Sequence, residues 1–404
     1  MTEAQITTAC ERLFTTRFML GLFDDACEYN AIPVTETDTD AHAALALKAA
    51  EKSMVLLEND GTLPLDPREI KTIAVIGPNA DSIPTLEGNY NGTSSRYVTF
   101  LEGIRRYAEA HGIRVLYSLG SHLFKDRTSG LAQADDRLAE AAMYAEIADA
   151  TIACVGLDAG LEGEEGDTGN EYFSGDKKDL LIPESQRRLL DTLEKCAKKL
   201  VTVIAAGSSL NVPQGNAKLF AWYPGQAGGT ALAEILFGEV NPSGHLPLTF
   251  YKDIGDLPSF EDYSMADRTY RYFSGEALYP FGYGLSYTRF STADAALGKA
   301  EDGQEIITVS VTNEGKRAGD AVVQVYAECD SPDAPTHPRL CGFKRITLNA
   351  GETKQASVPL DRLTRTVVNE AGERIPAEKV TFHVGLSQPD PLSVRLTGTK
   401  PLIL

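Results

Sequence analysis

Residues 150–186 read ATIACVGLDAGLEGEEGDTGNEYFSGDKKDLLIPESQ, an unbroken apolar run followed at once by an acidic, glycine-rich segment. The run at 150–155 is short and contains β-branched residues, which is typical of a strand buried on both faces of a sheet. The acidic segment should therefore leave the carboxyl end of that strand. Open α/β sheets hold their sites at this end, so the stretch indicates both a fold class and the position of a site.

The flanking sequence alternates between strand and helix patterns. Apolar strand patterns recur at residues 72–77, 113–120 and 200–207. Helical patterns lie around and between them, at residues 41–57, 100–110, 136–149, 184–199 and 229–237. This alternation predicts a mainly parallel α/β sheet with crossover helices on both faces.

The character of the chain changes after Asn241. An aromatic-rich stretch at 270–290 leads into alternating strand patterns at 306–313, 321–328, 344–352 and 379–385. These patterns predict an all-β sandwich of fibronectin type III-like, immunoglobulin-like type.

The start of the chain forms a third part. Ile6, Cys10, Leu13 and Phe18 fall at helical spacing, and Gly21 is placed to end that helix. A polar link follows the helix. We therefore divide the chain into a helix with linker at 1–41, an α/β-sandwich domain at 42–285 and a fibronectin type III-like domain at 286–404.

Composition narrows the range of partners. The chain has 404 residues and a formal net charge of −19, which argues against nucleic acid and anionic membrane surfaces. It lacks an apolar run of about 18 residues and a basic-then-apolar start, so we expect neither a membrane span nor secretion. Six scattered cysteines without a CxxC pair predict free thiols and a cytoplasmic location.

Four carboxylates could support proton chemistry. Glu162, Glu164, Glu165 and Asp167 lie close together in the acidic segment, so mutual repulsion should raise the pKa of at least one of them, as a general acid requires. Retaining glycosidases pair such an acid with a second carboxylate about 5 to 5.5 Å away. A solvated acidic loop or a Ca²⁺ site fits the composition at least as well, whereas the glutamates would repel a phosphate.

The other candidates are weaker. Asn79, Asp81, Asn89 and Tyr90 follow the strand at 72–77 and could line the same crevice, although Asx residues there are more often turn formers.

Three further side chains are expected to be structural. Trp222 and Tyr223 could stack on a sugar, but they follow an apolar run, which favours core packing. His245 has no second histidine at metal-ligand spacing. We therefore expect no metal and no cofactor.

Several segments, taken in order, resemble glycoside hydrolase family 3. They are LLENDGTLPL at 56–65, GPNAD at 77–81, the acidic segment ending in LLIPESQ, WYPGQAGGTALAEILFGEVNPSGHLPLTF at 222–250 and YPFGYGLSYTRF at 279–290. Two others, GNYNG at 88–92 and DYSMADRTYRYF at 262–273, look like the β-xylosidase-like branch of the family.

The resemblance implies an N-terminal (β/α)8 barrel, an α/β sandwich and a fibronectin type III-like domain, of which this chain matches the last two. Residues 6–24 look like the end of the barrel domain, so the resemblance implies that the barrel, and with it the family's nucleophilic aspartate, is absent. The family's Glu-Ala-Glu-x-x-Asp-Arg pattern places the acid/base glutamate at Glu164 and its aspartate at Asp167. Thr168 stands where the family often has Arg, so Glu162 and Glu165 remain alternates. For Asp167, capping of local backbone amides is as good an interpretation as substrate contact.

These observations predict the acid/base portion of a retaining β-glycosidase of β-xylosidase or β-glucosidase type. Its substrate would be an oligosaccharide or other glycoside, with Asp167, Asn89 and Tyr90 as substrate contacts. Its partner would be a separate barrel-domain polypeptide or a second copy in a homo-oligomer. Two alternatives remain open: a non-catalytic carbohydrate-binding or assembly module, and a truncated gene product that self-associates through exposed apolar surface.

Overall fold

The computed structural model describes residues 1–125, 133, 135–162 and 177–404. They form two compact units, Met1–Leu45 and Ala46–Leu404. The first contains helix α1 (Glu3–Met19), which begins with a capping box between Thr2 and Gln5. The predicted helix end is confirmed, because Gly21 follows it with φ +69°. Two 3₁₀ turns, η1 (Glu28–Ala31) and η2 (Val34–Glu36), come next.

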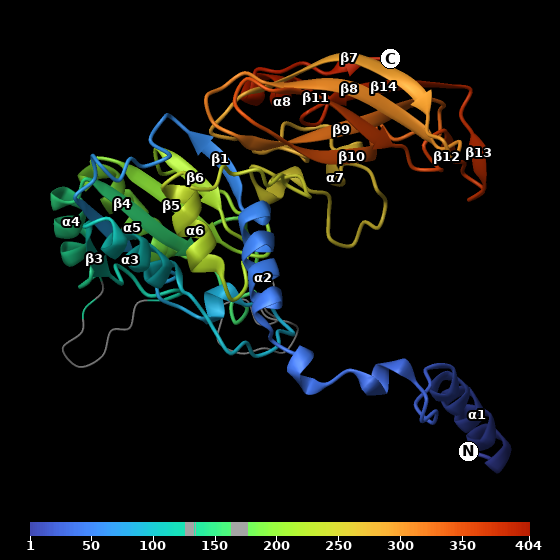
Figure 1. The fold of residues 1–404 in the computed structure, drawn as a ribbon, viewed down its shortest axis with the longest axis horizontal. Helices are drawn as coiled ribbons and strands as arrows, with labels where there is room; N and C mark the ends of the chain where they lie inside the picture. The colour runs from blue at the N-terminus through green and yellow to red at the C-terminus, as the bar shows by residue number, and fades with distance from the viewer. Residues whose placement is uncertain (126–132, 134, 163–176) are drawn as a thin grey trace. The chain divides into compact units, whose positions relative to one another are not determined.

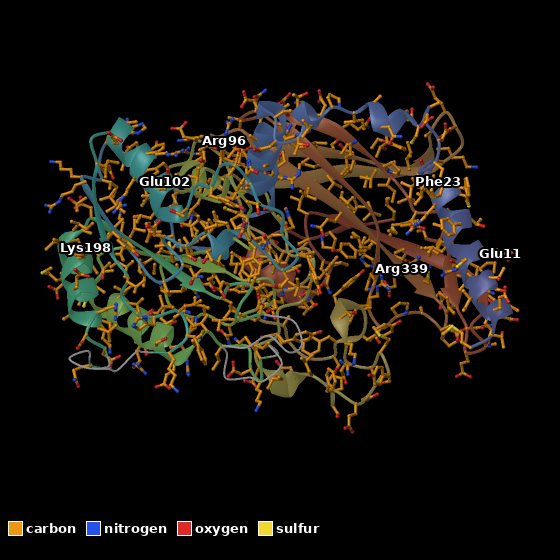
Figure 2. The ribbon with its side chains drawn as sticks, turned by 90° about the horizontal axis from the view of Figure 1, so that it is seen from below. Glu11, Phe23, Arg96, Glu102, Lys198 and Arg339 are labelled. Atoms are coloured by element: carbon orange, nitrogen blue, oxygen red, sulfur yellow. The ribbon has the colours of Figure 1, made fainter. Side chains whose placement is uncertain are left out.

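The helix α1 has no buried side chain. Phe23, which is labelled in Figure 2, follows the helix in sequence. Its ring packs back against Phe18, with ring centroids 4.7 Å apart. Phe18 nevertheless stays 67% exposed and Leu13 51% exposed. The apolar side chains of this unit are therefore largely open to solvent.

The second unit begins with a six-stranded sheet (Figure 1). Its strands are β1 (Val55–Asn59), β2 (Thr72–Ile76), β3 (Arg114–Ser118), β4 (Ala150–Gly156), β5 (Leu200–Ala205) and β6 (Ala217–Phe220). They lie in the order β1-β6-β5-β4-β2-β3. All neighbours are parallel except β1, which runs antiparallel to β6. The predicted mainly parallel sheet is confirmed.

Helices cover both faces of this sheet. They are α2 (Asp40–Ser53), α3 (Phe100–Ala110), α4 (Leu138–Ile147), α5 (Glu184–Cys196) and α6 (Gly228–Leu236). On β4, Ile152 and Cys154 belong to the core formed with α3 and α6. Ala153 and Val155 belong to a second core formed with α4 and α5. All seven residues of β4 are buried, because successive side chains of a strand point to opposite faces.

The helix predicted at 41–57 is wrong at its end. The helix stops at Ser53, and Val55 begins β1, which pairs with the unpredicted strand β6. An apolar run such as MVLL at 54–57 suits either a helix or a strand by pattern alone. Pairing with residues far along the chain decides between them.

The order of the strands reverses beside β2. From β2 the chain passes outward to the edge strand β3, then returns to the other side of β2 as β4 and continues to β5. The order therefore reverses between β2 and β4. Ligands of open α/β sheets bind at the carboxyl ends of the strands that flank such a reversal. The acidic segment follows β4 directly.

The rest of the second unit is antiparallel (Figure 1). Its strands are β7 (Phe290–Lys299), β8 (Glu305–Asn313), β9 (Gly319–Asp330), β10 (Arg339–Leu348), β11 (Thr353–Pro359), β12 (Thr366–Val368), β13 (Arg374–Pro376), β14 (Lys379–Gly385) and β15 (Leu402–Ile403). They form sheets in the orders β10-β9-β14-β15, β11-β8-β7 and β12-β13.

The two larger sheets enclose a core that includes Val309, Val323 and Phe382. The strand predicted at 344–352 ends instead at Leu348, where a turn leads into β11. Short helical segments complete the described chain: η3 (Pro84–Leu86), η4 (Ile254–Asp256), α7 (Thr269–Tyr272) and α8 (Pro391–Thr397).

The cysteines of the chain lie in all three of its parts. All six cysteines are free thiols. Cys154 is fully buried in β4, and burial raises its pKa. Among the helices that the structure describes, none has the length and apolar character needed to span a membrane.

Candidate active site

The backbone that leads into the acidic segment is tightly constrained. Gly156 ends β4 with φ +133°, and a Cβ there would lie 1.9 Å from the carbonyl oxygen of Ala205 on the neighbouring strand. Only glycine fits this position. The Gly156 amide donates to Oε1 of Gln186 at 2.7 Å, and Nε2 of Gln186 donates back to the Gly156 carbonyl at 2.7 Å. Gln186 lies on the first turn of α5, so the two ends of the 156–186 stretch are joined.

Glu162 is the part of the acidic cluster that the structure describes. Its carboxylate accepts hydrogen bonds from the Gly207 amide at 2.6 Å and from the hydroxyls of Ser208 and Tyr223. Gly207 and Ser208 follow β5, and Tyr223 follows β6. Glu162 thus connects the carboxyl ends of three adjacent strands.

These contacts make Glu162 an acceptor. Burial of Tyr223, together with the negative charge of Glu162, raises the pKa of that phenol, which therefore remains a neutral donor. The hydrogen bonds of Glu162 therefore hold the start of the acidic segment against the loops after β5 and β6.

The loop after β2 is attached to the same region. Nδ2 of Asn79 donates to the Leu157 carbonyl at 2.8 Å, and Nδ2 of Asn89 donates to the Glu162 carbonyl at 3.2 Å. Asp158 turns the backbone between them, because its carbonyl accepts the Glu162 amide at 2.9 Å. The segments after β2 and β4 are therefore joined across the point where the strand order reverses.

A buried cation marks the far end of the acidic segment. The Lys177 side chain is 9% exposed, donates to the Leu181 carbonyl and lies 3.7 Å from the Asp179 carboxylate. Burial lowers the pKa of its amine, while the charges of Asp179 and Glu162 act in the opposite direction. The charges of Lys177 and Glu162 therefore interact across the two ends of the acidic segment.

The predicted site residues have different outcomes. The Asn89 side chain contacts the backbone carbonyl of Glu162, and the roles of both residues remain predictions. Tyr90 is 87% exposed. Asp81 accepts a hydrogen bond from Oγ1 of Thr99, the residue that caps α3, at 2.8 Å. Three predicted residues lie outside the described part of the chain and remain predictions: Glu164, Glu165 and Asp167.

Sequence reasoning misjudged one member of this site. Core packing was predicted for Trp222 and Tyr223 alike. It holds for the Trp222 ring, which meets Phe220 edge-on at 4.6 Å. Tyr223 instead directs its hydroxyl to Glu162. Trp222 has φ +59°, so the backbone bends between the two side chains.

Other members were missed altogether. Gly207 and Ser208 carried no recognisable signal, because one contributes only its amide and serines are common in loops. Gln186 carried a weak signal, as the last residue of the LLIPESQ segment. The described residues contain no group of three or more His, Cys, Asp or Glu side chains that could hold a metal ion. The Ca²⁺ alternative concerned the acidic segment, most of which lies outside these residues.

Comparison with known families agrees with this arrangement. Residues 54–287 match the model of the glycosyl hydrolase family 3 C-terminal domain. The chain belongs to glycosyl hydrolase family 3. Residues 321–388 match a fibronectin type III-like domain, so both the recognised family and the predicted order of an α/β domain followed by this β-domain are confirmed.

The relatives of this chain include proteins named as β-xylosidases and proteins named as β-glucosidases. The chain is 33% identical to a β-xylosidase of Formosa agariphila, in a match that covers 94% of this chain and 53% of that protein. It is 34% identical to a periplasmic β-glucosidase of Salmonella typhimurium, over 89% of this chain and 51% of that protein. The chain thus spans about half the length of these relatives.

A solved structure shows the same architecture. The β-glucosidase EmGH1 from Erythrobacter marinus superposes with a TM-score of 0.80 at 30% identity, covering 95% of this chain and 54% of that one. A β-glucosidase of Bifidobacterium adolescentis gives a TM-score of 0.75 at 31% identity, over 89% and 53% of the two chains.

Proposed function

We propose that this chain contributes the acid/base part of a retaining β-glycosidase that removes terminal xylose or glucose from oligosaccharides and other β-glycosides. The observation that carries the proposal is the attachment of Glu162 to the carboxyl ends of three strands. The acidic segment itself follows β4, one of the two strands that flank the reversal of the strand order. The names of the relatives support the substrate class.

Glu164 is the proposed proton donor. Glu162 is disfavoured because its carboxylate already accepts three hydrogen bonds. Glu164 would protonate the leaving oxygen and later remove a proton from the attacking water. Asp167, Asn89 and Tyr90 are the proposed substrate contacts. The second carboxylate, which forms the covalent bond to the sugar, would come from a barrel domain outside these 404 residues.

The first test measures turnover of aryl β-xylosides and aryl β-glucosides by the chain, alone and mixed with a family 3 barrel-domain protein. We expect hydrolysis only in the mixture. Glu164→Gln should lower kcat/KM, which reports the first half-reaction, by about 10² to 10⁴ for a substrate with a poor leaving group, the range typical of general acid catalysis. The loss of kcat/KM should be much smaller for a dinitrophenyl glycoside, whose leaving group needs no proton.

Glu165→Gln is the matched control, because it removes a neighbouring carboxylate of the same segment. It should retain most of the activity. An equal loss for both leaving groups would contradict the assignment of Glu164. Sugar binding that survives Glu164→Ala, with no turnover under any condition, would instead support a non-catalytic carbohydrate-binding module.

A further inference from the structure

A second feature lies on the other side of Trp222. A pocket of about 500 Å³ is lined there by residues from the end of α2, the turn after β6 and strands β9 and β10. Its walls include Trp222, Phe281, Leu340 and Phe343. None of the residues that bind the Glu162 carboxylate lines it.

The size and the walls of this pocket suit a flat apolar molecule. A cavity of about 150 Å³ is enough for benzene, and ligand sites commonly fall between about 300 and 1,000 Å³. Phe343 is 66% exposed although it lines the pocket. An aromatic ligand would cover part of this apolar surface and could stack on the surrounding rings.

Positive charge lies at the edge of the pocket. Nζ of Lys52 is 2.5 Å from Oδ2 of Asp320, and Nη1 of Arg345 is 3.5 Å from the same oxygen. Two cations thus share one carboxylate, in a chain whose net charge is −19. The Lys52 side chain is 37% exposed and that of Arg345 is 31% exposed. Arg345 also donates to Oγ of Ser243 and to the Lys52 carbonyl, which leaves Lys52 as the less constrained of the two cations.

The neutral polar groups of the pocket differ in whether they can still form a hydrogen bond to a ligand. Nε2 of Gln324 already donates to the carbonyls of Gly282 at 2.9 Å and Leu386 at 3.1 Å. Nδ1 of His245 lies 3.0 Å from the Ser243 carbonyl, which can only accept, so Nδ1 carries the proton. Burial lowers the pKa of His245 to about 4, which leaves Nε2 as an unprotonated acceptor at neutral pH.

We propose that this pocket binds a small aromatic carboxylate that also carries a hydroxyl group. The ring lies among Trp222, Phe281 and Phe343, the carboxylate pairs with Lys52 and Arg345, and the hydroxyl donates to His245. The proposal is independent of the glycosidase function, because it uses none of the residues assigned to that reaction.

The test titrates the 404-residue chain with 4-hydroxyphenylacetate by calorimetry, in parallel with the fluorescence of Trp222, the only tryptophan of the chain. Three analogues each remove one feature: phenylacetate lacks the hydroxyl, cyclohexylacetate lacks the aromatic ring, and tyramine replaces the carboxylate with an ammonium group. We expect the parent compound to bind and change the fluorescence. Each analogue should bind at least about threefold more weakly, and tyramine the most weakly of all.

Phe343→Ala and Lys52→Met should each weaken binding by at least about threefold. Phe260→Ala is the matched control, because Phe260 is 90% exposed and does not line the pocket. Thermal unfolding of each variant shows whether it is folded. Absence of binding by the folded chain, equal binding of tyramine, or unchanged binding by folded Phe343→Ala would overturn the proposal. So would fluorescence that depends on protein concentration alone, which would indicate that a second copy fills the pocket.

Discussion

Trp222 and Tyr223 are adjacent in sequence but lie in opposite chemical environments. Tyr223 donates its hydroxyl to the Glu162 carboxylate, which accepts three hydrogen bonds in all. The donors of these bonds follow β5 and β6. Trp222 donates its indole N–H to the Ser53 carbonyl at 3.0 Å, and its ring borders a largely apolar pocket. The backbone at Trp222, with φ +59°, separates the two directions.

The difference shows how structural and binding roles can be told apart. Around Glu162, donors and acceptors are matched within the protein, so the cluster primarily stabilises the backbone. Around Trp222, apolar surface is exposed and two cations share one carboxylate, so a ligand would gain from occupying the space. Mutations in the two regions should therefore affect different measurements.

The largest expected effect is on the Glu162 side. Glu162→Ala should lower the free energy of unfolding by about 3 kcal/mol, because it removes three hydrogen bonds that a carboxylate accepts from the Gly207 amide and two hydroxyls. Urea denaturation measures this loss.

A double-mutant cycle with Tyr223→Phe isolates one of these hydrogen bonds, and the two losses should be clearly non-additive. Glu261→Ala, at an exposed position, serves as the control and should change stability by less than about 0.5 kcal/mol. A similarly small effect of Glu162→Ala would show that the cluster does not stabilise the fold.

The second expected effect is on the pH dependence of stability, and it arises from His245, which lines the same pocket as Trp222. Burial lowers the pKa of His245 from 6.5 to about 4, so the unfolded chain binds a proton more readily than the folded chain does. The stability linked to this group is therefore fully present above pH 6.5 and is lost as the pH falls towards 4. Between about pH 7.5 and about pH 5, the contribution amounts to roughly 2 kcal/mol.

Urea unfolding of the wild type and of His245→Gln at both pH values measures this term. The difference in stability between the two proteins should shrink by roughly 2 kcal/mol on acidification. Equal pH dependence of the two proteins would mean that the imidazole does not remain neutral in the folded state.

The smallest expected effect is that of Lys52→Met on stability, and it distinguishes a ligand contact from a residue that the fold requires. Lys52→Met should lower the free energy of unfolding by less than about 1 kcal/mol, because a partly exposed ion pair contributes little and Arg345 remains beside Asp320. Thermal unfolding checks this prediction. A loss as large as that of Glu162→Ala would place Lys52 in the structural framework and weaken its proposed role as a ligand contact.

Much of the α/β fold could be predicted from particular residues. The ATIACV run identified β4 because continuous apolar sequence suits a strand buried on both faces. The helix at 100–110 was correct to the residue, since its apolar side chains follow helical spacing. The boundary at 53–55 was missed because Met54 to Leu57 carry no periodicity, and β6 was missed because it is only four residues long.

The site was less predictable for a different reason. Acidic residues can be recognised directly in a sequence, but the groups that donate hydrogen bonds to them cannot. Gly207 contributes an amide, which any residue possesses, and Tyr223 follows an apolar run that suggests a core position. Which way Tyr223 points depends on the backbone conformation of Trp222, and local pattern does not specify a positive φ for tryptophan.

The pairing of β1 with β6 has a consequence for biosynthesis. Val55 lies opposite Phe220 and Asn59 opposite Ala217, so the ribosome makes β1 long before its partner exists. At about 5 to 20 residues per second, the delay is roughly 10 to 30 seconds. During that interval the apolar run at 54–57 has no sheet to join. Until translation reaches β6, this run is a segment through which the nascent chain can aggregate.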